Sequence, residues 1–164
     1  LVGSEMCIRA SSGGVLDQAY EMFEQQTPHR LIKHELLIDS AGAGQWRGGL
    51  GVETIFEIGS DDTQLVTFGD GDFEGAFGLA GGHGAGLNFI RLHRPDGQTV
   101  VPRNKDLITG VERGTVYHQV ANGGGGWGDP GKRDRKTLAE EVRNGVISRQ
   151  AALRDYGMTD AELT

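Results

Sequence analysis

The chain has 164 residues and a mass of 17.6 kDa, which is enough for one domain with a sizeable core, and its mean hydropathy of −0.37 argues against a membrane protein. A single cysteine, Cys7, excludes an internal disulfide and fits a reducing cytoplasm. The formal net charge of −7 falls within residues 1–128, and no Lys or Arg lies between Arg47 and Arg91, so this acidic surface would repel the phosphates of a nucleic acid.

The first part of the chain is predicted to form one helix followed by three strands. Apolar residues recur at helical spacing from Val15 onward, and the helix must end before Pro28. Residues 31–38, 52–58 and 64–68 have strand patterns. The second of these alternates, with apolar residues on one face and Glu53 and Glu57 on the other.

A hairpin and a further strand are predicted next. Residues 88–92 lead into a turn at residues 94–97, and residues 99–101 return from it. Residues 115–121 alternate again, with His118 on the apolar side, where we expect a hydrogen-bonded core residue. Short strands at frequent turns predict an α+β fold: mainly an antiparallel β sandwich or barrel, with an N-terminal helix and a helical C-terminal tail.

The tail carries the signals that begin and end helices. Thr137 and Glu140 are spaced as a capping box, and Gly145 lies where a left-handed residue would end the helix. Ser148 is expected to cap a second helix that Gly157 closes. We expect these surface helices to dock on a sheet or on a partner. The predicted organisation is a disordered or artefactual N-terminus (1–12), a glycine-rich β domain with its leading helix (13–131) and a helical tail (132–164).

Residues 123–130 are the most informative stretch, with the sequence Gly-Gly-Gly-Gly-Trp-Gly-Asp-Pro in a chain that has 28 glycines. Consecutive glycines allow another group to approach the main chain closely. Trp127 adds one large flat side chain, and Pro130 ends any regular element. We interpret the run as a shaped wall that closes the β domain.

Two ligand motifs are imitated but not completed. Gly126, Gly131 and Lys132 have P-loop spacing, yet Arg133 stands where a Ser or Thr would hold Mg²⁺, so we reject a phosphate site. Asp70 opens an imitation of an EF-hand loop whose twelfth position lacks the required Glu. A solvated acidic turn is the better interpretation there, with weak Ca²⁺ binding as the alternative.

Four residues are candidate substrate contacts: Arg47, Asp70, His83 and Trp127. His83 stands in a glycine loop, where a binding role or a structural one is possible. Arg47 follows Trp46 and precedes two glycines, so its guanidinium could bind a carboxylate or stack on Trp46. The alternative is a structural residue that ties a loop to backbone carbonyls. The sequence shows no complete catalytic set, and the catalytic residues are unknown.

Four motifs in order carry a resemblance to a known family: residues 39–51, 77–82, 123–130 and 142–148. Over about residues 15–157 the chain resembles the C-terminal part of the hydantoinase B/oxoprolinase family. Residues 70–72 and 110–118 are similar to its carboxylase-related members. Residues 1–9 resemble no family element, and family members are much longer, so the chain looks like a C-terminal fragment.

The resemblance implies ATP-dependent opening of hydantoins or 5-oxoproline, or carboxylation of ketones. It implies ATP and a divalent metal in the full complex, with none held by this chain. Its implied partners are a hydantoinase A-type ATP-binding subunit and the remainder of the hydantoinase B-type chain, in which the metal motif lies upstream. The chain is expected to contribute subunit contacts and a pocket wall. The alternative is a free-standing β-rich module that binds a small polar ligand or a sugar through Trp46, Trp127 and His83.

Overall fold

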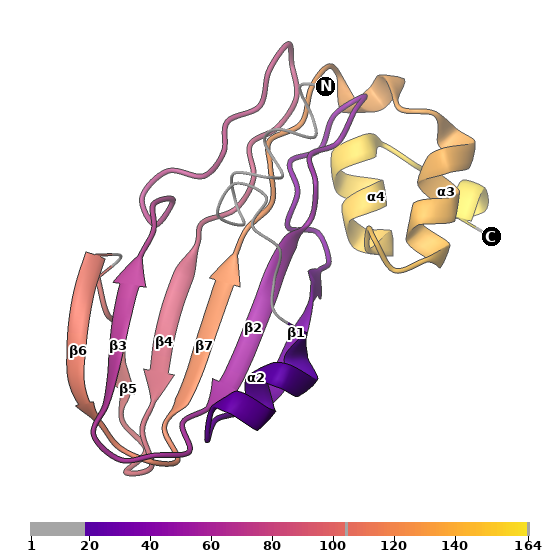
Figure 1. The fold of residues 1–164 in the computed structure, drawn as a ribbon. Coiled ribbons are helices and arrows are strands. Elements are labelled where there is room, and N and C mark those ends of the chain that lie inside the picture. The colour runs from indigo at the N-terminus through magenta and orange to yellow at the C-terminus, as the bar shows by residue number, and fades with distance from the viewer. Residues whose placement is uncertain (1–18, 104, 164) are drawn as a thin grey trace.

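The computed structural model describes residues 19–103 and 105–163, and Figure 1 shows two antiparallel sheets with helices at both ends of the described chain. Five strands form the main sheet in the order β1-β2-β7-β4-β5, and β3 pairs with β6 in a second sheet. The strands are β1 (Arg30–Leu37), β2 (Gly51–Glu57), β3 (Thr63–Phe68), β4 (Phe89–His93), β5 (Thr99–Val100), β6 (Lys105–Val111) and β7 (Val116–Ala121). The expected antiparallel α+β fold is confirmed.

The register of the main sheet places the aromatic pair of β2 and β7 on one face and charged residues, together with the apolar Ile55 and Val120, on the other. β2 lies between β1 and β7, and Phe56 stands opposite Tyr117 while Glu53 stands opposite Val120. The aromatic rings of Phe56 and Tyr117 stack with centroids 4.6 Å apart, and Phe23 meets Phe56 edge-on at 6.0 Å. Phe23 belongs to α2 (Tyr20–Gln26), so this helix covers part of the face that carries the aromatic pair. The predicted alternation of β2 is therefore correct.

Strand β6 was not expected from the sequence. Thr109 and Gly110, whose φ is 65°, interrupt the apolar residues of this strand, so its sequence shows no regular alternation. Pairing with β3 makes it a strand, with Val66 opposite Leu107 and Phe68 opposite Lys105. Long-range hydrogen bonding thus decides what the local pattern leaves open.

The tail forms α3 (Arg135–Arg143), α4 (Arg149–Tyr156) and a final 3-10 turn, η2 (Asp160–Leu163). Ser148 caps α4, and Gly157 ends it with φ 62°, as predicted. The expected cap at Thr137 is wrong, because Asp134 is the N-cap of α3 and its carboxylate accepts hydrogen bonds from both the amide and the hydroxyl of Thr137. An Asp one turn earlier supplies the same acceptor, so the helix begins sooner.

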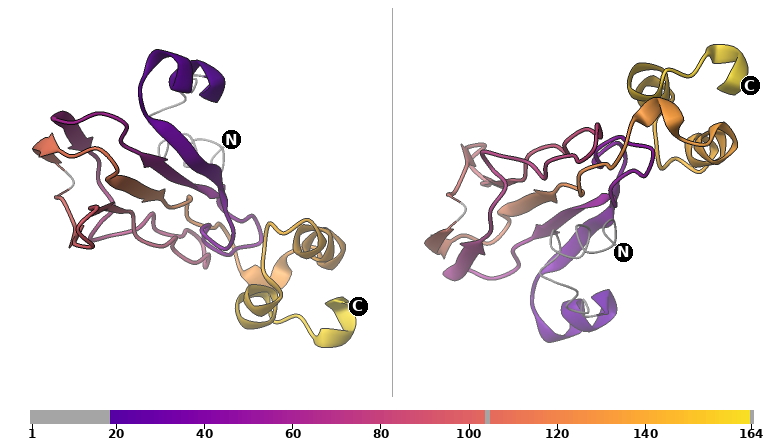
Figure 2. Two further views of the ribbon diagram at one scale, coloured as in Figure 1. Left: turned by 90° about the horizontal axis from the view of Figure 1, so that it is seen from below. Right: turned by 90° about the horizontal axis from the view of Figure 1, so that it is seen from above.

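The tail helices pack on a glycine-rich loop of the β region rather than on a sheet. Their buried side chains, with Ala43 of that loop, form one apolar cluster: Leu138, Ile147, Ala151, Ala152, Tyr156 and Met158. Two views along the sheet show the tail set to one side of the strands (Figure 2). The expectation of docking on a sheet is thus corrected. Within the described ranges, no helix is long and apolar enough to cross a bilayer.

Candidate functional site

Three loop segments above the main sheet lie side by side and bond through their backbones: residues 39–50, 76–88 and 122–129 (Figure 1). We call them the glycine layer. The 122–129 segment is central, because the Gly42 amide donates to the Gly124 carbonyl at 2.9 Å and the Leu79 amide donates to the Gly126 carbonyl at 2.9 Å. The outer segments also meet directly where the His83 amide donates to the Ala43 carbonyl at 2.7 Å.

Glycine is required in this layer because the backbones are in contact. A Cβ on Gly48 would lie 1.9 Å from the Gly124 carbonyl oxygen, and one on Gly125 would lie 2.0 Å from that of Phe77. The close approach expected at the glycine run is confirmed, and the approaching group is the chain's own main chain. Residues 123–126 are buried, and the Gly126 amide donates to the His83 carbonyl, so this amide is already bonded within the chain.

Two tryptophans project from this layer. Trp46 and Trp127 exchange both backbone hydrogen bonds, at 2.9 and 2.8 Å, while their side chains remain 65% and 45% exposed. The pair therefore presents two large aromatic side chains from a backbone that other segments hold on both sides. Such side chains can stack on a ring or on an apolar group.

Arg47 points to the tail. Its Nε lies 2.7 Å from Oε1 of Glu141 in α3, and one of its terminal nitrogens donates to the Gly48 carbonyl. A terminal nitrogen of Arg133 lies 2.8 Å from each oxygen of the same carboxylate, and Arg133 also donates a hydrogen bond to the Gln45 carbonyl. The side chains of Arg133 and Glu141 are only 9% and 14% exposed, so this is a half-desolvated cluster of two cations around one anion. Arg47 thus ties the glycine layer to α3, and its role as a substrate contact stays a prediction.

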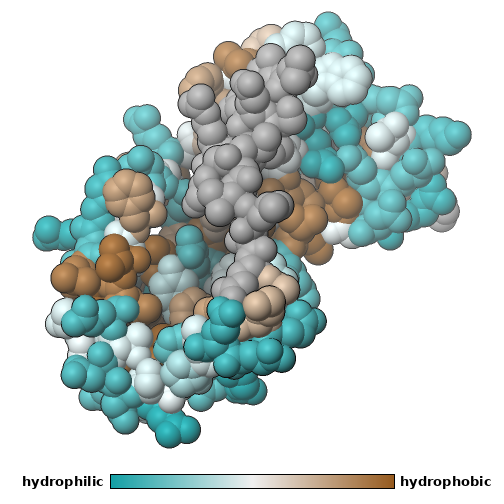
Figure 3. Space-filling view, in the orientation of Figure 1, coloured by the Kyte–Doolittle hydropathy of each residue, from teal (hydrophilic) through white to brown (hydrophobic). Residues whose placement is uncertain are grey.

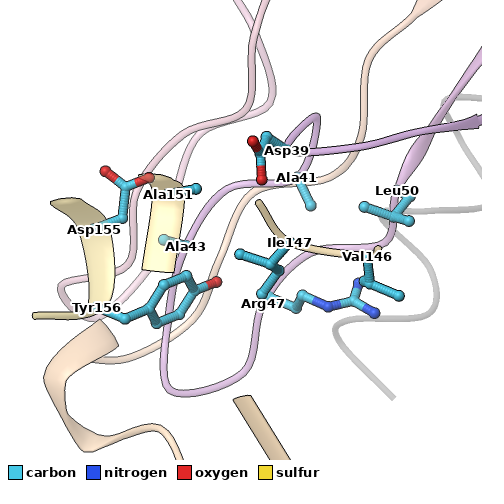
Figure 4. A pocket seen from close by; sticks show the side chains of 10 residues that line it. All are labelled: Asp39, Ala41, Ala43, Arg47, Leu50, Val146, Ile147, Ala151, Asp155 and Tyr156. Atoms are coloured by element: carbon cyan, nitrogen blue, oxygen red, sulfur yellow. The ribbon is translucent and has the colours of Figure 1, made fainter. Parts of the chain in front are cut away.

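A small cavity lies where the glycine layer meets the tail. Figure 4 shows the Tyr156 hydroxyl pointing into it, with Arg47, Asp39 and Asp155 among the lining side chains. Burial is the main cause that raises the pKa of Tyr156, so this hydroxyl stays protonated. The cavity measures about 20 Å³, which admits about one water molecule and no organic substrate. The Ser148 amide donates to the Asp39 carboxylate at 2.8 Å and closes one side of the junction.

The four predicted contacts do not converge on one point. His83 and Trp127 both belong to the glycine layer, where the His83 carbonyl accepts a hydrogen bond from the amide of Gly126, the residue before Trp127. Arg47 faces the tail. The Asp70 carboxylate is almost fully exposed and meets Lys105 at 3.3 Å, while its carbonyl accepts from the Asn88 side chain. In the described ranges, no group of three or more His, Cys, Asp or Glu is placed to hold a metal ion.

A further polar cluster lies on the face of the main sheet opposite the aromatic pair. Glu53 accepts hydrogen bonds from Lys33 at 2.7 Å and from Nε2 of His118 at 2.8 Å. The bond from Lys33, followed by that from His118, lowers the pKa of Glu53. His118 is hydrogen-bonded, as expected, and its side chain is 18% exposed, with its ring edge-on to that of Phe89 at a centroid distance of 5.1 Å. The sequence did not predict this cluster, since the β2–β7 register brings its members together.

With this geometry established, comparison with known proteins identifies the family. Residues 3–130 match the model of the hydantoinase B/oxoprolinase family. The chain belongs to this family. The match begins at residue 3, so the expectation that residues 1–9 resemble no family element is wrong for residues 3–9. The N-terminus predicted to be disordered or artefactual, residues 1–12, lies outside the described ranges.

Individual relatives agree with this membership. The chain is 32% identical over 151 residues to the beta subunit of caprolactamase from Pseudomonas jessenii, covering 89% of this chain and 26% of that protein. It is 24% identical over 173 residues to the alpha subunit of acetone carboxylase from Xanthobacter autotrophicus, covering 84% of this chain and 22% of that protein. This hydantoinase B-family chain thus spans about a quarter of the length of these relatives.

Solved structures show the same fold. The ATP-dependent caprolactamase from Pseudomonas jessenii has a TM-score of 0.74 at 30% identity, covering 91% of this chain and 27% of that one. Nucleotide-free acetone carboxylase has a TM-score of 0.69 at 21% identity, covering 87% and 23% of the two chains. The second likeness establishes the fold alone.

Proposed function

We propose that this hydantoinase B-family chain works as the C-terminal portion of one subunit in an ATP-dependent enzyme that opens cyclic amides. The observation that carries the proposal is the likeness to the beta subunit of caprolactamase, which extends over nearly the whole chain in both sequence and structure. Hydantoins, 5-oxoproline and lactams are the candidate substrates. Carboxylation of a ketone is the second possibility, supported by the fold shared with acetone carboxylase.

The role of this portion is to form a pocket wall and subunit contacts. The glycine layer supports a wall because its backbone is fixed by hydrogen bonds from three segments while Trp46 and Trp127 project from it. A polar ring substrate would stack on these tryptophans, and His83 at the same layer would supply a hydrogen bond. Arg47 and Asp70 are further candidate contacts, which would meet a bound substrate where other parts of the subunit approach them.

ATP and a divalent metal enter the proposal through other parts of the complex. ATP would bind a hydantoinase A-type subunit, and the metal would bind the upstream part of the hydantoinase B-type chain. The described residues do not offer a donor set that fits such a metal. A cytoplasmic location remains a prediction.

The test compares the purified chain with the assembled enzyme. The chain alone is expected to show no ATP-dependent turnover of hydantoin, 5-oxoproline or caprolactam, whereas a complete subunit with its A-type partner should turn over one of them. Measurable ATP-dependent ring opening by the isolated chain would overturn the proposal. The complete subunit that contains this chain should also co-purify with a full-length A-type subunit.

The exposed tryptophan pair keeps one alternative open, a free-standing module that binds a sugar or another small polar ligand. That role predicts a monomer whose tryptophan fluorescence is quenched by a sugar at saturating concentration. The Trp127→Ala variant would abolish such quenching. No saturable change with a sugar panel, together with co-purification of the A-type subunit, would remove this alternative.

A further inference from the structure

The two-stranded sheet presents an apolar outer face. Val66, Phe68 and Leu107 form this face, which we call the β3–β6 face, and they are 75%, 87% and 59% exposed. Val66 stands directly opposite Leu107, and Phe68 stands opposite Lys105, so the register places all of them on one side. Thr67 turns to the other side and is buried. The exposed side chains are therefore the regular outer half of a strand pair.

An antiparallel pair with one free face normally turns polar residues outward. Here hydrophobic side chains gather over the ends of β3 and β6 on the face seen in Figure 3. In the segment between β3 and β4, Phe73 and Phe77 are also 89% and 69% exposed. Exposed apolar residues that cluster in this way mark an interaction site more often than a free surface.

The surroundings of the β3–β6 face are acidic. Between Arg47 and Arg91 there is no Lys or Arg, and the segment from Asp61 to Glu74 contributes five carboxylates. Lys105 meets Asp70 at 3.3 Å and the Phe68 ring at 6.0 Å. Arg103 and Arg113, which flank β6, are the other nearby cations, so the carboxylates still outnumber the cations. An occupant should therefore have an apolar centre and a basic rim. A second copy of this chain would bring two acidic rims together, which disfavours self-association.

We propose that the β3–β6 face is the seat of another portion of the same hydantoinase B-type polypeptide, one with an apolar centre and a basic rim. This inference rests on the proposed function. The chain spans about a quarter of its relatives and 27% of the solved caprolactamase chain, so the additional polypeptide is long enough to cover this face. The occupant belongs to the same subunit, which makes the face a permanent internal interface.

Thiol accessibility tests the proposal. Val66→Cys and, separately, Leu107→Cys place a reporter on the β3–β6 face in a Cys7→Ser background, and Gln98→Cys places a control in the exposed polar turn before β5. Each is made in the isolated chain and in the complete subunit expressed from the native reading frame. The rate of modification by a small maleimide is measured. Both face reporters should react at least tenfold more slowly in the complete subunit, while the control changes less than twofold.

Equal rates at position 66 in both proteins would overturn the proposal. Protection in the isolated chain that grows with its concentration would also overturn it, because the occupant would then be a second copy. Protection that requires an added A-type subunit would assign the face to that partner instead. Ring-opening activity of the unmodified complete subunit with its A-type partner is measured in parallel. Lost protection with intact activity would therefore refute the interface and leave the proposed function standing.

Discussion

The glycine layer predicts that one added methyl group will destabilise the protein. In the Gly125→Ala variant, Cβ would lie 2.0 Å from the Phe77 carbonyl oxygen and 2.6 Å from its carbonyl carbon. Cβ atoms essentially never come within 3.0 Å of such atoms, so one segment must move by about 1 Å. Both contacting groups are backbone, and no side-chain rotation can relieve the overlap.

The cost follows from what this movement disturbs. Overpacking a closely packed interior costs about 1–3 kcal/mol. Displacing residue 125 also weakens the hydrogen bonds that the Gly124 and Gly126 amides donate to Gly49 and His83, each worth about 1 kcal/mol. We therefore expect the free energy of unfolding to fall by about 3–5 kcal/mol, a large part of the stability of a typical domain.

Two matched variants separate overlap from backbone freedom. Gly69→Ala has no atom within 4 Å of the new Cβ, and we expect a change within about 1 kcal/mol. Gly145→Ala is equally uncrowded but has φ 69°, so it should lose about 1–2 kcal/mol from the left-handed backbone alone. Urea unfolding followed by circular dichroism and tryptophan fluorescence measures all three. If the free energies of unfolding of Gly125→Ala and Gly69→Ala differ by less than about 1 kcal/mol, the glycine layer is not packed as described.

Three further variants test the junction, a helix cap and the sheet. Glu141→Gln removes the carboxylate that Arg47 and Arg133 share and should lower the free energy of unfolding in urea by about 3 kcal/mol. Glu57→Gln, at an exposed pair, should lower it by less than about 1 kcal/mol, and equal losses would contradict this. Ser148→Ala should cost about 1 kcal/mol, since the Ser148 hydroxyl accepts the Ala151 amide. Burial raises the pKa of Tyr117 to about 12, so its contribution to stability is complete below pH ~10 and is lost between pH ~10 and ~12. Tyr117→Phe should flatten this fall in the free energy of unfolding with pH, and an unchanged pH profile would refute the reasoning.

Features set by neighbouring residues were predictable from the sequence. The alternation of β2, the turn with Gly97 at φ 86°, the Ser148 cap and the Gly157 terminus each depend on a few consecutive residues. The predicted start of α3 was wrong because two capping patterns overlap: Asp134, the observed N-cap, precedes Thr137 by one turn. Local chemistry identifies helix ends well, and it fails when it offers two equivalent acceptors.

Features that join distant segments were not predictable. Arg47 and Glu141 are 94 residues apart, and Glu53 and His118 are 65 residues apart. Neither pair follows from spacing, because one depends on how the tail docks and the other on the β2–β7 register. Strand β6 was missed for the same reason, since its pairing with β3 compensates for a poor local pattern.

The glycine run now has a specific physical meaning. Its amides and carbonyls bond to neighbouring backbones, so the layer itself offers no cradle for a phosphate and instead sets the positions of what flanks it. On one side it presents Trp46 and Trp127, and on the other it carries Ala43 and Arg47 into the tail junction. Any group that binds at the tryptophans therefore meets a surface whose backbone is coupled to the helical tail. A substitution at Glu141 should accordingly disturb the orientation of the Trp46–Trp127 pair, although no atom of Glu141 needs to touch a ligand.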